Sequence, residues 1–381
     1  MVFNWKRIKE ILIQRKGLGV LSLSDITGTS ITSIFWFYIA FVIQPEQYGE
    51  IFYFISIVSI AFNLSNIGTE NNTIVLTAKG KNLESTLSTI SLLFGTIASS
   101  VLIIIFYEID IIILLFGYII NSLSLGYLIG RRFYSKYAKF LIAQKILTVL
   151  LGVSFYYLFG ADGIISALGI SYMGFLIIIV HLYRKSPINF REFKNNFNFI
   201  WQNFSLKFIG ALRDNIDKLI ILPLLGFSFL GNYALAMQFI AVLSMPNAIF
   251  FKYMLTNDSR KIPNKNLKKY YLLGSVGISV LSSISLPILI PIFFPNFTDI
   301  DVIRIMSFVL IPNAIINIKI SELLGDEKSK PVMFSAIVAL ITVAVGVTIL
   351  GSIFGGDGIA ITYVLASTFM AAFLLIWTRK K

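Results

Sequence analysis

Residues 159–164 read Phe-Gly-Ala-Asp-Gly-Ile, and residues 354–359 read Phe-Gly-Gly-Asp-Gly-Ile. The two strings are 195 residues apart, and the same offset carries Arg184-Lys185 onto Arg379-Lys380 without a gap. Gly-Asp-Gly alone is an ordinary tight-turn sequence. The shared six-residue string together with the matching basic ends favours a different explanation, which is that the chain is an internal duplication.

The composition is that of an integral membrane protein. Hydrophobic residues make up 56% of the 381 residues, charged residues 13%, and the mean hydropathy is +0.82. Soluble chains carry about 25% charged residues, so this chain could not cover its surface with solvated groups. The absence of Cys excludes disulfides and thiolate metal sites, and the single His181 argues against a histidine metal site or a catalytic triad. We expect no metal and no cofactor.

Apolar runs long enough to cross a bilayer lie between clusters of charge. They predict twelve transmembrane helices, at 19–43, 48–68, 86–107, 111–130, 141–160, 163–183, 200–222, 233–254, 271–293, 302–325, 331–354 and 358–378. With the N-terminus inside, the predicted inner segments contain 25 Lys and Arg and the outer loops contain none. Because basic residues stay on the cytoplasmic side, both termini are predicted to be cytoplasmic. The net charge of +13 therefore follows from topology, and no nucleic acid partner is expected.

A second, fainter internal match has an offset of 182. It pairs Gly49, in Pro45-Glu-Gln-Tyr-Gly49, with Gly231, in Phe227-Ser-Phe-Leu-Gly231. The predicted fold is all-α, with an N-terminal six-helix bundle over 1–185, a cytoplasmic linker loop over 186–199 and a C-terminal six-helix bundle over 200–381. Since six is even, the two halves share one orientation, and a pseudo-two-fold axis along the membrane normal would relate them, as in several transporters.

Three motifs carry a family resemblance that covers nearly the whole chain. They are Pro45-Glu-Gln-Tyr-Gly49, then Asp217-Lys-Leu-Ile-Ile followed by Leu230-Gly-Asn-Tyr233, and finally Gly355-Gly-Asp-Gly-Ile-Ala360. In order and spacing the chain resembles the Wzx-type O-antigen and polysaccharide flippases of the multidrug/oligosaccharidyl-lipid/polysaccharide (MOP) exporter superfamily. The resemblance implies a MATE/MOP-like fold with two bundles around a central cavity.

The resemblance also implies a function and a location. A lipid-linked oligosaccharide, carried on a polyprenyl phosphate or diphosphate, would move from the cytoplasmic to the outer leaflet of the plasma or inner membrane. We expect a monomer surrounded by membrane lipids, with transport coupled to a proton or sodium ion by alternating access. No residue in the sequence identifies the sugar.

Five charged residues lie in the seventh predicted helix. At 100° per residue, Lys207, Arg213, Asp214, Asp217 and Lys218 fall within a sector of about 140°. The pairs Arg213/Asp217 and Asp214/Lys218 are spaced i,i+4 and could neutralise each other. One interpretation is a paired seam between helices. The other is a substrate site, in which Arg213, Lys207 or Lys218 contacts a phosphate, Arg offers bidentate geometry and Asp217 orients the guanidinium.

Asp25 in the first helix is the candidate for ion coupling, because a buried carboxylate can exchange a proton. The 182 offset places Asp25 opposite Lys207, so a static Asp25–Lys207 bridge is the alternative. Helices eight and ten share the strings Pro246-Asn-Ala-Ile249 and Pro312-Asn-Ala-Ile315. Proline removes a backbone hydrogen bond, so these strings predict either a hinge or cavity bend, or simple helix curvature.

Three classes of function are open to a membrane protein of this kind. The leading hypothesis is a flippase for lipid-linked oligosaccharides, and the second is a multidrug or small-solute antiporter of the same superfamily. The basic face of helix seven favours an anionic substrate, whereas exporters of cationic drugs favour acidic cavities. The third class, an integral membrane glycosyltransferase or polymerase, needs a sizeable external segment, and no predicted outer loop exceeds ten residues. No phosphate-binding loop of the G-x-x-x-x-G-K-[ST] type occurs. We therefore expect a transporter and not an enzyme.

Overall fold

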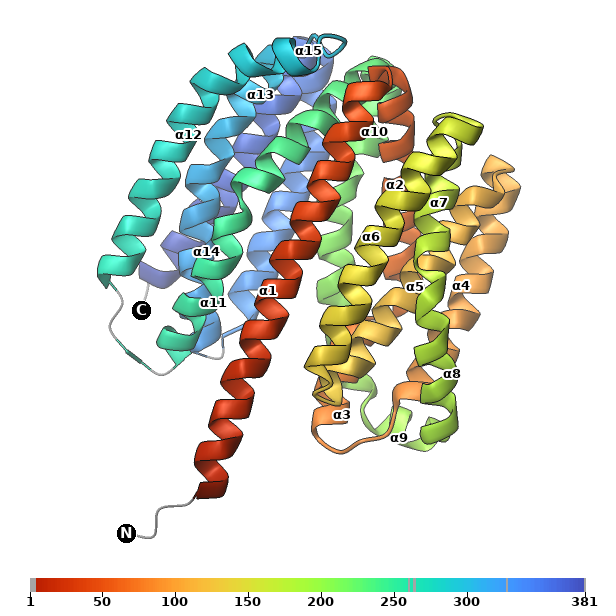
Figure 1. Ribbon diagram of the computed structural model, residues 1–381. Helices are drawn as coiled ribbons and strands as arrows, with labels where there is room; N and C mark the ends of the chain where they lie inside the picture. Colours follow the sequence, from red (N-terminus) through yellow and green to blue (C-terminus); the bar gives the residue numbers. More distant parts are fainter. Residues whose placement is uncertain (1–4, 260, 263–264, 327, 380–381) are drawn as a thin grey trace. The chain divides into compact units, whose positions relative to one another are not determined.

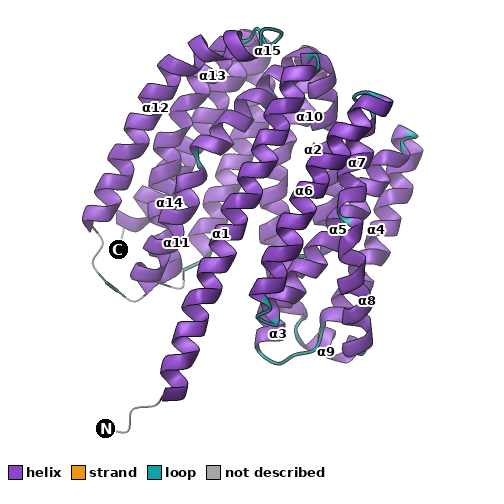
Figure 2. Ribbon diagram, in the orientation of Figure 1, coloured by secondary structure: helices purple, strands orange, loops and turns teal. Residues whose placement is uncertain are grey.

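The computed structural model describes residues 5–259, 261–262, 265–326 and 328–379. Within these ranges the chain forms helices joined by short turns, and there is no strand (Figure 2). Helices satisfy all their backbone hydrogen bonds internally, which the hydrocarbon of a bilayer requires. Residues 1–4 and 380–381, at the two predicted cytoplasmic termini, and Arg260 of a predicted inner loop lie outside the described residues.

Ten helical segments of the described chain are long and apolar enough to cross a membrane. Two of them, Phe197–Leu243 and Lys330–Thr378, have 47 and 49 residues, or about 70 Å each at 1.5 Å per residue. A bilayer core is only about 30 Å thick. Each long segment contains one glycine with a non-helical backbone, Gly226 or Gly355, at its middle.

Contacts across these glycines show that the two long segments are hairpins. Tyr233 OH donates a 2.5 Å hydrogen bond to Asp217 Oδ2, although sixteen residues of continuous helix would span about 24 Å. A methyl group added at Gly346 would likewise lie 2.5 Å from Thr362 Cγ2. Each of these two segments therefore supplies two helices, so the described residues contain twelve candidate crossings, the number that the sequence predicts, and the chain is a multi-pass membrane protein.

The chain divides into two compact units, each described here by itself. Unit 1 contains the residues up to Phe35 and Val58–Phe208. Its helices are most of α1 (Trp5–Val42), the end of α2 (Pro45–Asn66), α3 (Thr69–Ala78), α4 (Glu84–Phe106), α5 (Ile109–Gly130), α6 (Tyr134–Phe159), α7 (Gly163–Ser171), η1 (Met173–Phe175), α8 (Leu176–Lys185), α9 (Phe190–Asn195) and the start of α10 (Phe197–Leu243). α5 is the central helix, because α3, α4, α6, α7 and α8 all pack against it (Figure 1).

Unit 2 contains Trp36–Ile57 and the residues from Ile209 onward. Besides the remaining parts of α1, α2 and α10, its helices are α11 (Met245–Ser259), α12 (Lys265–Phe293), α13 (Ile300–Met306), η2 (Ser307–Val309), α14 (Leu310–Gly325) and α15 (Lys330–Arg379). Here α14 is central, since α11, α12 and α15 pack against it (Figure 1). α5 is the fourth crossing and α14 belongs to the tenth, so equivalent crossings of the two repeats occupy equivalent places.

The compact units differ from the predicted halves in two places. Residues 36–57 pack with the C-terminal repeat, and the start of the seventh crossing, up to Phe208, packs with the N-terminal repeat. Aromatic contacts hold residues 36–57 against the C-terminal repeat. The ring centroids of Phe37 and Phe239 are 4.7 Å apart, and those of Tyr48 and Phe297 are 5.7 Å apart. The linker that was predicted as a loop over 186–199 contains the short helix α9, whose first turn is capped by Asn189 Oδ1, which accepts from Glu192 N at 3.0 Å.

The duplicated strings form the same turn in both repeats. Gly160 and Gly355 both have positive φ, at 74° and 57°, a conformation that costs glycine little. A methyl group at Gly163 would lie 2.8 Å from the carbonyl oxygen of Phe155, and one at Gly358 would lie 1.9 Å from that of Leu350. All three pairs of positions are related by the offset of 195, so the sequence repeat is also a repeat of backbone structure.

A partly buried ion network joins three crossings at one end of each unit. In unit 1, Glu84 at the start of α4 lies 2.6 Å from Arg131 at the end of α5 and accepts a hydrogen bond from Thr77 of α3. In unit 2, Lys268 near the start of α12 lies 2.8 Å from Asp258 of α11 and 3.0 Å from Glu322 of α14. The two networks occupy equivalent positions with the signs of the charges inverted. Each holds the predicted cytoplasmic ends of its unit together.

Candidate functional site

Unit 2 contains a cavity of about 450 Å³ that is lined by four helices, α10, α11, α14 and α15. This volume lies within the range of small-ligand sites, about 300–1,000 Å³. Its polar lining side chains are Arg213, Asp214, Asp217, Ser244, Asn247, Asn313, Asn317, Tyr363 and Ser367. Three of the five charged residues that the sequence singled out in the seventh crossing therefore line one cavity.

Arg213 is held by one carboxylate and keeps part of its guanidinium available. Its Nε and Nη2 each lie 2.8 Å from Asp214 Oδ1. Its third nitrogen, Nη1, faces only the sulfur of Met370, at 4.0 Å. Thioether sulfur is a weak acceptor, so the protons of Nη1 remain available to a stronger acceptor in the cavity.

The predicted i,i+4 pairing of the charges is wrong, and adjacent residues pair instead. Asp214 pairs with Arg213, whereas Asp217 Oδ1 lies 3.1 Å from Lys218 Nζ. Lys218 Nζ also donates to the backbone oxygen of Asp214 at 2.8 Å, because side chains on a helix lean toward its N-terminus. Asp214, and not Asp217, therefore orients the guanidinium of Arg213.

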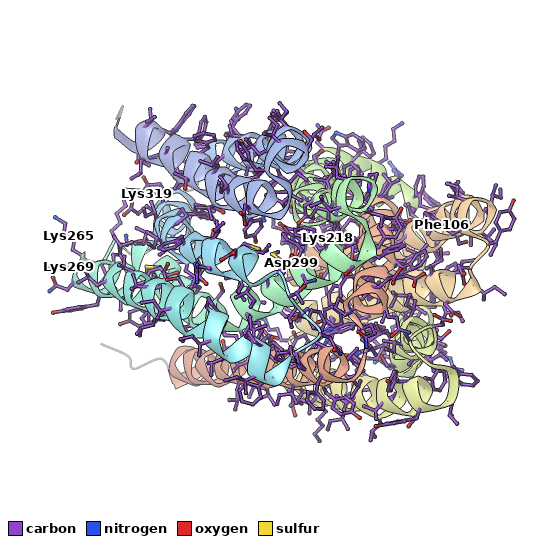
Figure 3. All side chains as sticks on the ribbon, turned by 90° about the horizontal axis from the view of Figure 1, so that it is seen from above. Phe106, Lys218, Lys265, Lys269, Asp299 and Lys319 are labelled. Carbon is purple, nitrogen blue, oxygen red and sulfur yellow. The ribbon has the colours of Figure 1, made fainter. Side chains whose placement is uncertain are left out.

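Asp217, Lys218 and Tyr233 form a buried cluster that joins the two arms of the α10 hairpin. The side chains of Asp217 and Lys218 are 3% and 9% exposed, and Tyr233 OH donates to Asp217. Lys218 lies among the helices in Figure 3 and does not line the cavity. Lys218 therefore fits the interpretation of a paired seam between helices, whereas Arg213 and Asp214 line the cavity and fit the interpretation of a substrate site.

Lys207 belongs to unit 1, with Asp25. Lys207 Nζ lies 3.9 Å from Glu70 Oε2, and Asp25 Oδ1 accepts a 2.6 Å hydrogen bond from Tyr137 OH. Asp25 and Glu70 are close enough to interact electrostatically. Glu70 and Tyr137 were missed in the sequence because neither shares a helix with its partner.

Asn247 and Asn313 also line the cavity. They were not among the predicted site residues, although a hinge or cavity bend was one interpretation of their Pro-Asn strings. In the structure each string follows a local irregularity in its crossing. α10 ends at Leu243 and α11 begins at Met245, while α14 begins at Leu310 after the 3-10 turn η2, whose backbone stays helical. Pro246 therefore stands in the first turn of α11, a position that proline favours, whereas Pro312 lies in a continuous helix, where its missing N–H removes a backbone hydrogen bond.

Two carboxylates outside the crossings have shifted pKa values. The hydrogen bond from Asn196 and the neighbouring Lys81 hold the pKa of Glu192 below its usual range, so Glu192 stays ionised and ties α9 to the turn before α4. Burial and the charge of Asp357 raise the pKa of Asp299. Among the described residues no group of three or more His, Cys, Asp or Glu is placed to hold a metal ion.

The fold is that of the membrane transporters of the MOP superfamily. At 17% identity, the lipid II flippase MurJ in an inward closed conformation superposes with a TM-score of 0.69 over 94% of this chain and 87% of that one. A multidrug resistance MATE family transporter in an inward-facing conformation gives 0.68 at 15% identity over 93% and 94%.

A third solved structure is a MOP superfamily transporter from Pyrococcus furiosus whose binding pocket is described as having reverse polarity. It gives a TM-score of 0.67 at 15% identity over 96% of this chain and 95% of that one. No family model and no curated protein sequence matches the chain. At these identities the likeness establishes the fold.

Proposed function

We propose that this protein flips a lipid-linked oligosaccharide from the cytoplasmic to the outer leaflet of the plasma or inner membrane. The fold supports a transporter, and one of the similar structures is a lipid II flippase. The carrier would be a polyprenyl phosphate or diphosphate, as the sequence resemblance implies. The protein would act as a monomer, with both termini in the cytoplasm.

The observation that carries this proposal is the state of Arg213. A guanidinium with an unused nitrogen at a cavity wall is a binding group for phosphate oxygens, because it donates in a planar fork and never loses its charge. Asp214 holds it from the other side, so it is already oriented before a ligand arrives.

Asp25 is our proposed coupling residue for a proton or sodium ion. It is an ionisable group within a crossing, which is costly unless it has partners or a function. Its hydrogen bond from Tyr137 and its proximity to Glu70 place it in a polar cluster of unit 1. A cation that neutralises Asp25 would change the charge of this cluster.

Export of organic cations is the second candidate, and one observation favours it. The side chain of Asp214, which lines the same cavity, is 60% exposed. A carboxylate that a solute can reach would attract a cation. Against this, Arg213 already occupies one oxygen of Asp214, and the buried Asp217 is paired with Lys218.

The two candidates are separated by reconstituting the purified protein in liposomes. One assay follows the movement of a fluorescent lipid-linked oligosaccharide between leaflets, and the other follows efflux of an organic cation. We expect flipping above protein-free liposomes and no cation efflux. Cation efflux without flipping would replace the proposal with the antiporter.

A further inference from the structure

Two asparagine side chains in the cavity of unit 2, Asn247 and Asn313, have no hydrogen-bond partner within the described chain. A third amide, Asn317, is engaged, because its Nδ2 donates to Tyr271 OH at 3.1 Å. Both side chains are half-buried, so their donors and acceptors face the cavity and are open to a ligand. The two free amides are therefore candidates for ligand contacts.

The same local device places both amides at the cavity. Each follows a proline next to a local irregularity in its crossing: Asn247 comes after the turn at Ser244, and Asn313 comes after the 3-10 turn η2. Backbone groups that proline leaves without a helical partner are tolerated within a membrane where they line a cavity. Asn247 and Asn313 come from two different crossings, so they approach one ligand from two sides of the lining.

The composition of the lining indicates what kind of ligand fits. The chain has 34 Phe, yet no Phe or Trp is among the described lining residues, and Tyr363 is the one aromatic side chain there. Sites for organic cations use aromatic faces, so this lining does not suit them. An amide offers two donors and an acceptor, which complements hydroxyl groups that both donate and accept.

From this arrangement we infer that Asn247 and Asn313 bind hydroxyl groups of the sugar attached directly to the phosphate that Arg213 contacts. The ligand of the cavity is then a glycosyl phosphate, the junction between carrier and oligosaccharide. The cavity volume of about 450 Å³ is that of a small-ligand site, which is the size class of such a junction. This inference rests on the proposed function, and it specifies which part of the substrate unit 2 recognises.

The test compares the affinity of the purified full chain for three soluble probes: glucose 1-phosphate, N-acetylglucosamine 1-phosphate and ethyl phosphate. The wild-type protein should bind at least one sugar phosphate about tenfold more tightly than ethyl phosphate. Asn247→Ala and Asn313→Ala should each reduce that preference about 2- to 12-fold, the effect of one hydrogen bond, without changing the affinity for ethyl phosphate. Arg213→Ala should weaken all three probes.

Two further sets of variants keep the result interpretable. Asn247→Leu and Asn313→Leu keep the number and branching of the side-chain heavy atoms and should lose the preference to the same degree, which rules out a collapsed cavity. Asn215→Ala is the control, because Asn215 is on α10 with its amide bonded to Ala211 O and does not line the cavity. Wild-type affinity for both sugar phosphates that is undetectable or equal to that for ethyl phosphate would overturn the inference.

The flipping assay separates this inference from the proposed function. Flipping of lipid-linked oligosaccharide without a preference for sugar phosphates would support the proposed function and overturn the inference about Asn247 and Asn313. Binding of sugar phosphates with the predicted preference but without flipping would overturn the proposed function. Inhibition of flipping by the soluble probe would show that the free sugar phosphate and the lipid-linked one share the cavity.

Discussion

Gly49 and Gly231 each pack against the turn that precedes the other. A methyl group at Gly49 would lie 2.1 Å from the carbonyl oxygen of Phe227, and one at Gly231 would lie 1.9 Å from that of Pro45. Pro45 and Phe227 are themselves related by the offset of 182 that relates the two glycines. The contact is therefore reciprocal, as contacts across a two-fold axis are. It explains why a faint sequence match joins these two positions.

Substituting either glycine with alanine should destabilise the protein. The neighbouring atoms are backbone oxygens, which cannot rotate away, so the helices would have to separate. We expect Gly49→Ala and Gly231→Ala each to cost about 1–3 kcal/mol, as overpacking does, measured by thermal unfolding in detergent. Gly210→Ala is the matched control, since nothing lies within 4 Å of a methyl group there. Equal stability of all three variants would show that the reciprocal contact is not tight.

Removing Arg213 should weaken substrate recognition and leave folding intact. Arg213→Ala should cost about 1.5–3 kcal/mol if it deletes a hydrogen bond to a charged group, or roughly 10- to 150-fold in apparent affinity during flipping. Arg213→Lys should restore part of this, because an ammonium cannot form the planar fork. Asp214→Asn should have a smaller effect, since it only loosens the guanidinium. If Arg213→Ala flips at the wild-type rate, Arg213 does not bind the phosphate.

The buried cluster of Asp217, Lys218 and Tyr233 should govern stability. Asp217→Asn leaves the Lys218 charge buried without a counter-charge, which costs about 3–5 kcal/mol. Tyr233→Phe removes one hydrogen bond to the carboxylate and should cost about 1.5–3 kcal/mol. The double variant Asp217→Asn with Lys218→Met should be more stable than Asp217→Asn alone. Folded yield and thermal unfolding are the measurements, and additive losses would contradict the pairing.

Asp25→Asn should abolish the stimulation of flipping by an imposed proton or sodium gradient, while flipping without a gradient continues. Glu70→Gln is the comparison, because Glu70 lies beside Asp25 and pairs with Lys207, and it should keep the stimulation. The charge swap Asp25→Lys with Lys207→Asp tests the alternative of a static bridge. Full activity in the swapped protein would reject the coupling role.

The predicted topology can be tested by cysteine labelling, since the chain contains no Cys. Single cysteines at Asp162 and Lys265 should react differently with a reagent that cannot cross the membrane. Lys265, like Lys269, projects from the beginning of α12 (Figure 3) and should be protected in intact cells. Asp162 is exposed in the turn before α7 and should be labelled. Labelling of Lys265 from outside would reverse the orientation.

The number of crossings, the helical class and the duplication could all be predicted from the sequence. The reason is that a bilayer leaves few solutions: an apolar run must be helical and about 30 Å long, whatever it packs against. The turns of the repeat were equally predictable, because Gly160 and Gly355 supply a backbone conformation that other residues rarely adopt.

Helical spacing correctly predicted which face of the seventh crossing carries the charged residues of the cavity, but it predicted the wrong ion-pair partners for them. Arg213, Asp214 and Asp217 share a cavity as their sector predicts, but spacing alone suggested i,i+4 ion pairs. The choice of carboxylate that pairs with an arginine or a lysine depends on the other residues packed around that carboxylate. Tyr233, from the other arm of the hairpin, bonds Asp217 inside unit 2, so Asp217 pairs with Lys218 and Asp214 is left to Arg213.

Only the tertiary structure decided which helices share a compact unit and which polar groups meet in the cavity. Residues 36–57 join the C-terminal repeat because their aromatic rings and Gly49 pack there. Asn247 and Asn313 line one cavity because α11 and α14, from two different crossings, both border it. Such contacts join residues far apart in the chain, and no periodicity within a single helix encodes them.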